Sequence, residues 1–314
     1  MDLRKVCGFL DERQSRGTGC VLVTVCAVEG SSMRGPGTIM GVAEDGSFAG
    51  SLSGGCIENA VVAEALEALR QRSPRLVRFG AGSPYLDIKL PCGGGLDLQF
   101  SPLGTATLPR QCLAAIARRQ PFSIGIENGS AHFLPDWRKA RFDPDAQSGH
   151  FGHWPEPRLV IAGHGAGVEA LADLAQTMGC SVAALTPDAA LADRLTMRGI
   201  PALRLARTTH TDLLQSDPWT GIAFVFHDHE WEIDLMARAL SLPHFYLGAM
   251  GGRTAHARRC EALSAKGVSD AQIAAIRAPI GLFHSSRDPQ TLALSTLAEV
   301  IRAYHQCDFE ARLG

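Results

Sequence analysis

The chain has 314 residues, of which 46% are hydrophobic and 20% charged, a composition typical of a folded globular protein with room for two hydrophobic cores. The 30 basic and 32 acidic residues give a formal net charge of −2. Because no long run of Lys or Arg is present, nucleic acid is not an expected partner.

The sequence also indicates where the protein acts. The longest apolar run, residues 21–28, is too short to span a bilayer, and the residues after Met1 lack the apolar stretch of a signal peptide. The nine cysteines are scattered without a CxxC pair, which favours reduced thiols. We therefore expect a cytoplasmic protein without membrane association.

The chain opens with a helix and three strands. Apolar residues recur at helical spacing between Leu3 and Leu10, which predicts an amphipathic helix. Residues 20–28 are apolar and β-branched and predict a buried strand. Residues 39–42 and 46–52 predict a hairpin.

A loop rich in glycine and serine follows the first predicted strand. It contains Ser31, Ser32 and Arg34. Small hydrogen-bond donors around a guanidinium suit a phosphate or carboxylate ligand. The alternative is an ordinary turn with a solvated Arg34.

The stretch 50–59 joins a predicted strand to a predicted helix. Ser53, Gly54 and Gly55 occupy the tight turn, where glycine allows a ligand to approach the backbone closely. Cys56 follows at the helix N-terminus, where the helix dipole favours the thiolate. The alternative is a glycine turn with a small buried cysteine.

A second cysteine lies beside glycines farther along. Strands are predicted over 75–79 and 86–90, followed by Cys92 and Gly93 and then by a half-buried strand over 96–100. Two Cys-Gly turns at strand ends could converge on one ligand.

The first domain ends with a predicted helix over 109–119 and a hairpin at Asn128-Gly129. Residues 136–157 contain prolines and charges with little periodicity, so we interpret them as a linker. The predicted domain covers residues 1–135.

The next segment has the pattern of a nucleotide-binding fold. A buried strand over 158–162 leads into Gly163, Gly165 and Gly167, and a helix follows. Val168 replaces the third glycine of the GxGxxG pattern.

Further strand-helix units continue this pattern. Strands are predicted over 181–185, 202–205, 222–226 and 244–247. With the strand over 158–162 they predict a sheet of about five parallel strands with right-handed crossovers. The fold class is therefore α/β, with a mixed N-terminal domain and a Rossmann-like doubly wound domain over 158–314.

The acid that would contact a nucleotide ribose is not at its usual place. Thr186 follows the second predicted strand at the place of the expected acid, and Asp188 lies two residues beyond. Either Asp188 contacts a ribose or no dinucleotide of this kind binds.

Polar residues follow the fourth predicted strand, where doubly wound folds bind ligands. His227, Asp228 and His229 could hold a metal or a polar ligand. In the alternative, Asp228 caps the next helix and both histidines are solvated.

The fifth strand ends in a glycine-rich turn with Gly251 and Arg253. Thr254 is placed to cap the following helix, and Arg253 beside free N–H groups would form an anion site. The alternative is a simple glycine turn. Ser269 and Asp288 are predicted caps of later helices.

Together these residues resemble the XdhC/CoxI family, the xanthine dehydrogenase accessory proteins. The similar stretches, in the family's order along nearly the whole chain, are 30–34, 50–58, 91–94, 160–167, 248–253 and 278–282. The resemblance implies a family-specific N-terminal domain followed by a Rossmann-like domain.

The resemblance also implies a function. Such a protein binds molybdenum cofactor, as molybdopterin mononucleotide or the cytosine dinucleotide form, and shields it during sulfuration. It then inserts the cofactor into a molybdenum hydroxylase apoenzyme of the xanthine dehydrogenase or aldehyde oxidase type. The family resembles chaperones more than catalysts, so no catalytic residues are expected. A cysteine desulfurase and a second copy of the chain are the other implied partners.

The candidate residues fit this expectation. Cys56 and Cys92 are soft ligands that could hold molybdenum or pass sulfur. Arg34 and Arg253 could bind the phosphate. A competing hypothesis is an NAD(P)-dependent oxidoreductase, indicated by the turn at Gly163 alone, and a third is a scaffold that binds no ligand.

Overall fold

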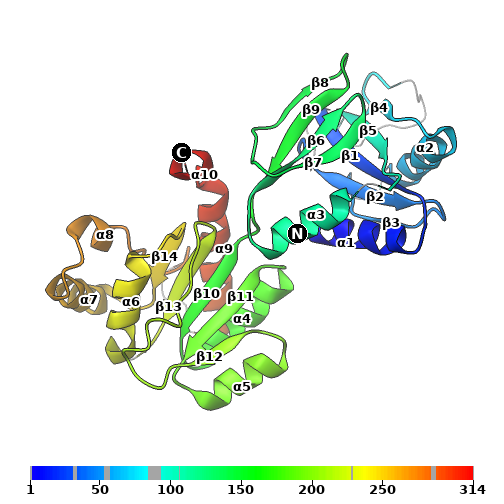
Figure 1. Cartoon of the computed structure of the whole chain (residues 1–314). Coiled ribbons are helices and arrows are strands. Elements are labelled where there is room, and N and C mark those ends of the chain that lie inside the picture. The colour runs from blue at the N-terminus through cyan, green and yellow to red at the C-terminus, as the bar shows by residue number, and fades with distance from the viewer. Residues whose placement is uncertain are drawn as a thin grey trace. The chain divides into compact units, whose positions relative to one another are not determined.

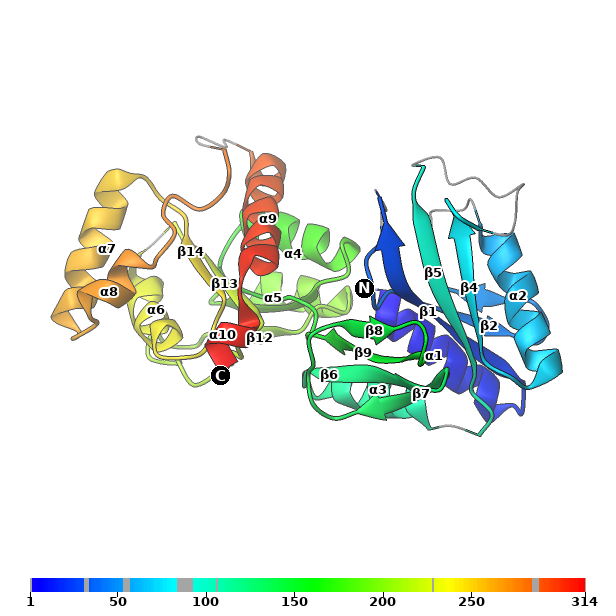
Figure 2. The same cartoon turned by 90° about the horizontal axis from the view of Figure 1, so that it is seen from above.

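The computed structural model describes residues 2–30, 34–52, 57–83, 93–105, 107–227, 229–283 and 288–313. The chain divides into two compact units, Met1–Pro155 and Glu156–Gly314. Figure 1 and Figure 2 show the elements of each unit, coloured from blue at the N-terminus to red at the C-terminus.

The first unit is built on a five-stranded antiparallel sheet in the order β3-β2-β1-β5-β4. Its strands are β1 (Cys20–Glu29), β2 (Ile39–Ala43), β3 (Phe48–Ala49), β4 (Arg75–Gly80) and β5 (Gly95–Pro102). The helices are α1 (Asp2–Ser15), α2 (Glu58–Gln71) and α3 (Leu108–Ala117). The strand predicted over 46–52 is shorter because Gly50, at a φ of 94°, ends it.

Alternation along β1 divides the core of this unit between the two faces of the sheet. Val21 and Val23 pack with Val61 of α2. Cys20 and Leu22 pack instead with residues of α1 and α3. Successive side chains of a strand point to opposite faces, so the continuous apolar run of β1 supplies both cores.

A second, four-stranded antiparallel sheet completes the first unit in the order β7-β6-β9-β8. Its strands are β6 (Phe122–Glu127), β7 (Ser130–Leu134), β8 (Arg141–Asp143) and β9 (Ser148–His153). The predicted hairpin at Asn128-Gly129 is confirmed, with both residues at positive φ.

The prediction of a linker over 136–157 is wrong for residues 141–153. They form β8 and β9, and β9 pairs with β6. These strands are short, and β9 consists of Ser, Gly and His around one buried Phe151. Such residues have low strand propensity, so pairing with β6 rather than local sequence stabilises them.

The second unit contains a five-stranded parallel sheet in the order β12-β11-β10-β13-β14, which confirms the Rossmann-like prediction. Its strands are β10 (Arg158–Gly163), β11 (Ser181–Thr186), β12 (Ala202–Arg204), β13 (Thr220–Val225) and β14 (Tyr246–Ala249). The chain builds outward from β10 to β12 and then returns to β13 on the other side. The topological switch point therefore lies between β10 and β13.

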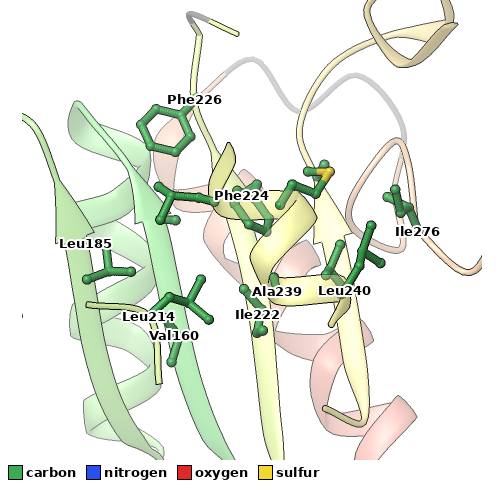
Figure 3. Packing of buried hydrophobic residues seen from close by; sticks show 14 of the residues in the cluster. Val160, Leu185, Leu214, Ile222, Phe224, Phe226, Ala239, Leu240 and Ile276 are labelled. Carbon is green, nitrogen blue, oxygen red and sulfur yellow. The ribbon is translucent and has the colours of Figure 1, made fainter. Parts of the chain in front are cut away.

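Helices cover both faces of this sheet (Figure 1). They are α4 (Ala166–Thr177), α5 (Ala189–Met197), η1 (His229–Trp231), α6 (Glu232–Leu240), α7 (Arg253–Ala265), α8 (Asp270–Ala274), α9 (Pro289–Gln306) and α10 (Phe309–Leu313). Figure 3 shows Ile222 and Phe224 of β13 packed with Ala239 and Leu240 of α6. On the other face, Val225 lies close to α4.

The segment after α8 lies beside β14. Arg277 forms a parallel bridge with Gly248, and Ile280 N donates to Ala249 O at 3.0 Å. The predicted caps are confirmed, because Ser269 forms a capping box and Asp288 Oδ1 accepts from Thr291 N at 2.8 Å. In the part of the chain that the structure describes, no helix has the length and hydropathy to cross a membrane.

Candidate functional site

Half of the predicted site residues lie in the described part of the chain. They are Arg34, Gly93, Gly163, Gly165, Gly167, Gly251 and Arg253. The others lie outside the described residues, and they are Ser31, Ser32, Ser53, Gly54, Gly55, Cys56 and Cys92. The predicted strand over 86–90 and the predicted cap Asp228 are also outside them.

Two candidate loops of the first unit begin at the same end of its sheet. Glu29 at the end of β1 pairs with Gly95 at the start of β5, and Gly80 at the end of β4 pairs with the same Gly95. A Cβ on Gly30 would lie 3.3 Å from the Cα of Gly94. The chain that leads to Ser31 and the chain that comes from Cys92 therefore meet at this end of the sheet.

A third loop leaves from the same end of the sheet. β2 runs antiparallel to both β1 and β3, so β1 and β3 end on the same side. Gly50 follows β3 at positive φ, and a Cβ there would lie 2.8 Å from Val6 Cγ2 and 2.9 Å from Ile39 O. Glycine is needed here for the turn and for close packing, which directs the chain toward residues 53–56.

Glu58 holds the two sides of this third loop together. Its side chain is buried, and its Oε1 accepts from Ser51 Oγ at 2.8 Å while Oε2 accepts from Ile57 N at 3.1 Å. The carboxylate thus fixes the chain before and after residues 53–56. We did not predict this role, because a Glu in the first turn of a helix is usually explained by the helix dipole alone.

Arg78 connects three strands at the end of the sheet where the first two loops begin. Its guanidinium binds Asp97 Oδ1 at 3.1 Å and donates to Ala81 O at 2.7 Å, and it also pairs with Glu29. These contacts join β1, β4 and β5 beside the loops. Arg78 was not among the predicted residues.

The glycine-rich turn after β10 has the expected form. Gly165, at a φ of 81°, is the N-cap of α4, and no described side chain caps this helix. Gly163 packs against the carbonyl of Val225, and a Cβ on Gly167 would lie 3.3 Å from Leu292 Cδ2. Gly165 therefore makes the turn, while Gly163 and Gly167 allow close packing within the protein.

The turn after β14 differs from the prediction in one respect. Gly252, not Thr254, is the N-cap of α7, and the helix begins at Arg253. Gly251 has a φ of 121°, a conformation that glycine adopts without strain. The helix N-cap lies two residues earlier than predicted. Arg253 is exposed beside the first N–H groups of α7.

A buried ion pair stabilises the turn between β14 and α7. Arg259 Nε lies 2.9 Å from Glu232 Oε1, and both side chains are buried. Arg259 Nη2 also donates to Met250 O at 2.7 Å. Arg259 therefore fixes the start of the turn that carries Arg253.

Asp188 has a structural role in the second unit. It is the N-cap of α5, and its Oδ1 accepts from Leu191 N at 3.1 Å. Its own N–H donates to the hydroxyl of the buried Thr186 at 3.2 Å. One carboxylate oxygen at the place of the expected ribose contact is thus already occupied by a helix cap.

The described cysteines are mostly buried and unreactive. Burial raises the pKa of Cys20 to about 11 and that of Cys26 to about 12. These thiols stay protonated at neutral pH, and the thiol form is a poor nucleophile and metal ligand. Among the described residues, no group of three or more His, Cys, Asp or Glu is placed to hold a metal ion.

Comparisons with known proteins agree with this architecture. The family described as "XdhC Rossmann domain" matches residues 159–300, and the family described as "XdhC and CoxI family" matches residues 13–80. A crystal structure of a protein described as a xanthine dehydrogenase from Bacillus halodurans has a TM-score of 0.78 at 19% identity. The match covers 99% of this chain and 98% of that one, which shows a common fold.

Two proteins of Escherichia coli (strain K12) are similar in sequence. The molybdenum cofactor insertion chaperone PaoD is 34% identical over 299 residues, covering 95% of this chain and 88% of PaoD. The uncharacterized protein YqeB is 25% identical over 277 residues, covering 83% of this chain and 39% of YqeB.

The fold and the matched regions define the class: a protein with an antiparallel N-terminal sheet followed by a Rossmann-like unit. More specifically, the chain belongs to the XdhC/CoxI family. The resemblance inferred from its short motifs is confirmed.

Proposed function

We propose that this protein is a molybdenum cofactor insertion chaperone. It binds the cofactor, protects it while the terminal sulfur ligand is installed, and delivers it to a molybdenum hydroxylase of the xanthine dehydrogenase or aldehyde oxidase type. The observation that carries the proposal is the similarity to PaoD along 95% of the chain. A similarity of this extent includes both units.

The described residues are compatible with a ligand of this chemistry. Molybdopterin has an anionic phosphate at one end and a molybdenum held by sulfur at the other. Arg253 is exposed at the first position of α7, and no described side chain caps this helix. The first backbone N–H groups of α7 can therefore donate to a phosphate. In the first unit, three loops start from one end of a sheet and can surround a common ligand.

Within this proposal each candidate residue has a role. Cys56 and Cys92 contact molybdenum or carry its sulfur, because thiolates are soft ligands. Arg34 and Arg253 bind phosphate, in a mononucleotide or a cytosine dinucleotide form of the cofactor. Gly163 and Gly167 contribute to the cofactor site by allowing the turn around Gly165 to pack closely against the protein. The remaining residues supply backbone N–H groups and close approach to the cofactor, and they are Ser31, Ser32, Ser53, Gly54, Gly55, Gly93, Gly165 and Gly251.

The proposal also names partners. The recipient is a molybdenum hydroxylase apoenzyme, the sulfur donor is a cysteine desulfurase, and the chaperone acts in the cytoplasm as a homo-oligomer. Nucleic acid and membranes are not involved. Co-purification with a tagged apoenzyme and with a tagged desulfurase, followed by light scattering of the chaperone alone, tests these three statements separately.

The decisive experiment is pterin analysis of the purified protein. The chain is isolated from cells that make molybdenum cofactor, and the oxidised, fluorescent pterin is measured together with molybdenum. We expect both in the wild-type protein and less in Cys56→Ala. Cys307→Ala, which removes a partly exposed thiol of the second unit, is the matched control and should retain both. Preparations that are consistently free of pterin would overturn the proposal.

One observation favours a second candidate function. The strand order β12-β11-β10-β13-β14 is that of dinucleotide-binding folds, which is compatible with an NAD(P)-dependent oxidoreductase. Titration with NADH and NADPH, followed by nicotinamide fluorescence, distinguishes the two functions. Saturable binding of either nucleotide by a pterin-free protein would favour the oxidoreductase.

A further inference from the structure

Two imidazole rings from distant parts of the chain lie next to each other in the second unit. His164 follows β10 and His227 follows β13, and their ring centroids are 5.7 Å apart with planes inclined at 57°. β10 and β13 are the neighbouring strands between which the topology reverses. Open α/β sheets bind ligands at the carboxyl ends of such strands.

His164 packs against the core, whereas His227 is accessible to solvent. His164 N donates to Val225 O at 3.4 Å, and its ring lies 5.7 Å from the ring of Phe226. Phe226 belongs to the buried cluster and lies at the end of β13 in Figure 3. His227 is exposed. The histidine pair therefore lies between the buried core, on the side of His164, and solvent, on the side of His227.

The separation of the rings fits two ligands of one metal ion. A histidine nitrogen binds Zn²⁺ at about 2.0–2.1 Å, so the ring centroid lies about 3.2 Å from the metal. Two rings at a tetrahedral angle then have centroids roughly 5.2 Å apart, and two opposite rings have centroids roughly 6.4 Å apart. The observed 5.7 Å lies between these values, and the inclined planes are not those of a stacked pair.

We propose that His164 and His227 bind a transition-metal ion of the Zn²⁺ class at the carboxyl ends of the central strands β10 and β13. Imidazole nitrogen suits Zn²⁺, Ni²⁺ and Cu²⁺, whereas Mg²⁺ and Ca²⁺ take oxygen ligands. Structural zinc sites have four protein ligands, but no third His, Cys, Asp or Glu joins this pair in the described part of the chain. Water or an oxyanion fills the remaining positions, so the metal is exchangeable.

This site is independent of the proposed chaperone function. It uses neither Cys56 nor Cys92, and it can be measured without pterin or a recipient enzyme. The sequence drew attention to His227 and its two neighbours, but His164 lies 63 positions earlier and joins His227 only because β10 and β13 are adjacent strands.

The test is a titration of the full-length chain, without an affinity tag, with Zn²⁺ alone. Cys56→Ser and Cys92→Ser are introduced first, because their thiols are candidate soft ligands. We expect one equivalent to bind, and Co²⁺ in its place to give visible absorption bands of nitrogen ligation. His164→Ala and His227→Ala should each weaken binding at least about tenfold. His305→Ala, which removes an exposed histidine of α9, should leave it unchanged.

A second variant separates metal binding from ring packing. His227→Phe keeps an aromatic ring beside His164 but has no nitrogen ligand, and because His227 is exposed the fold should be retained, as circular dichroism can verify. We expect this variant to lose the metal as His227→Ala does. Equal binding by all variants, or no binding of Zn²⁺, Ni²⁺ or Co²⁺ by the parent chain, would overturn the proposal.

Discussion

Arg259 shows how a single side chain can shape a candidate ligand loop. It is fully buried, yet it contacts both the carboxylate of Glu232 and the carbonyl of Met250. A buried charge needs a partner, because losing solvent costs several kcal/mol per ion. The pair therefore fixes α7, α6 and the turn before Arg253 relative to one another.

We predict that Arg259→Ala destabilises the second unit by about 3–5 kcal/mol, because it removes the buried cation that pairs with Glu232. Urea unfolding followed by circular dichroism measures the loss, and hydrogen exchange in α6 and α7 locates it. Arg258→Ala, at an exposed neighbouring position, should change the free energy of unfolding by less than about 0.5 kcal/mol. Replacing both partners, as Arg259→Met with Glu232→Leu, should recover much of the stability. Equal effects of Arg258→Ala and Arg259→Ala would contradict this account.

A second prediction concerns His153 and pH. Burial lowers the pKa of His153 to about 4, and its Nε2 has no hydrogen-bond partner among the described residues. Below the unfolded pKa of about 6.5 the unfolded chain binds a proton that the folded chain does not, so stability falls as pH decreases toward 4. Between pH 7 and 4.5 we expect a loss of about 2–3 kcal/mol that His153→Phe lacks.

The His153 prediction is measured by urea unfolding of the first unit at both pH values. Phenylalanine is the chosen replacement because His153 already packs against the ring of Phe122. His305→Phe, at an exposed position, should keep the pH dependence of the wild-type protein. The same pH dependence in His153→Phe as in wild type would show that this histidine titrates normally.

Single residues were predictable where the signal is local. Ser269 and Asp288 cap the expected helices, because a capping side chain and its backbone partner lie within three residues of each other. Thr254 was wrong because an extended Gly252 takes the cap position instead. The pairing of Arg259 with Glu232 depends on how α6 and α7 pack, and no spacing in the sequence reports it.

At the scale of elements, α9 holds the segment that lies beside β14. Glu299 Oε2 accepts from Tyr246 Oη and from Gly281 N, both at 2.7 Å. Burial and the neighbouring Glu299 raise the pKa of Tyr246, so its hydroxyl remains a donor. One carboxylate therefore joins α9, β14 and residues 280–283 at the edge of the sheet.

We predict that Glu299→Ala destabilises the second unit by about 2–4 kcal/mol, because the buried hydroxyl of Tyr246 and the half-buried N–H of Gly281 lose their acceptor. Glu299→Gln keeps an acceptor oxygen and should cost about 1 kcal/mol. Thermal unfolding ranks the variants, and hydrogen exchange at Gly281 should increase in Glu299→Ala. If Gln and Ala were equally destabilising, the charge rather than the acceptor geometry would hold the segment.

Helices and strands with a clear hydrophobic pattern in the sequence were predicted well. Strands that form only by pairing with a distant strand were not. The run over 158–162 followed by glycines and a helix led directly to β10 and α4, because the apolar strand and the turn are both local features. β9 has no such pattern and forms because β6 offers a partner edge. The start of the candidate loops from one end of the first sheet likewise follows from strand order, which short motifs do not contain.

At the scale of the whole molecule, each unit has its own cores. The cluster around Phe224 uses residues of the second unit, whereas those around Val23 and Leu22 use residues of the first. The three sheets are also each confined to one unit. Residues that share a hydrophobic core unfold together, so we expect each unit to unfold as a separate cooperative body.

We therefore predict two calorimetric transitions, and the variants above assign them. Arg259→Ala should lower the midpoint of one transition and leave the other in place, since Arg259 contacts Glu232 of α6 and Met250 O, both in the second unit. At pH 4.5, His153→Phe should raise the other midpoint relative to wild type, because the buried imidazole no longer opposes folding of the first unit. A single transition that both variants shift would show that the units unfold together, and the stability changes predicted above would then apply to the chain as a whole.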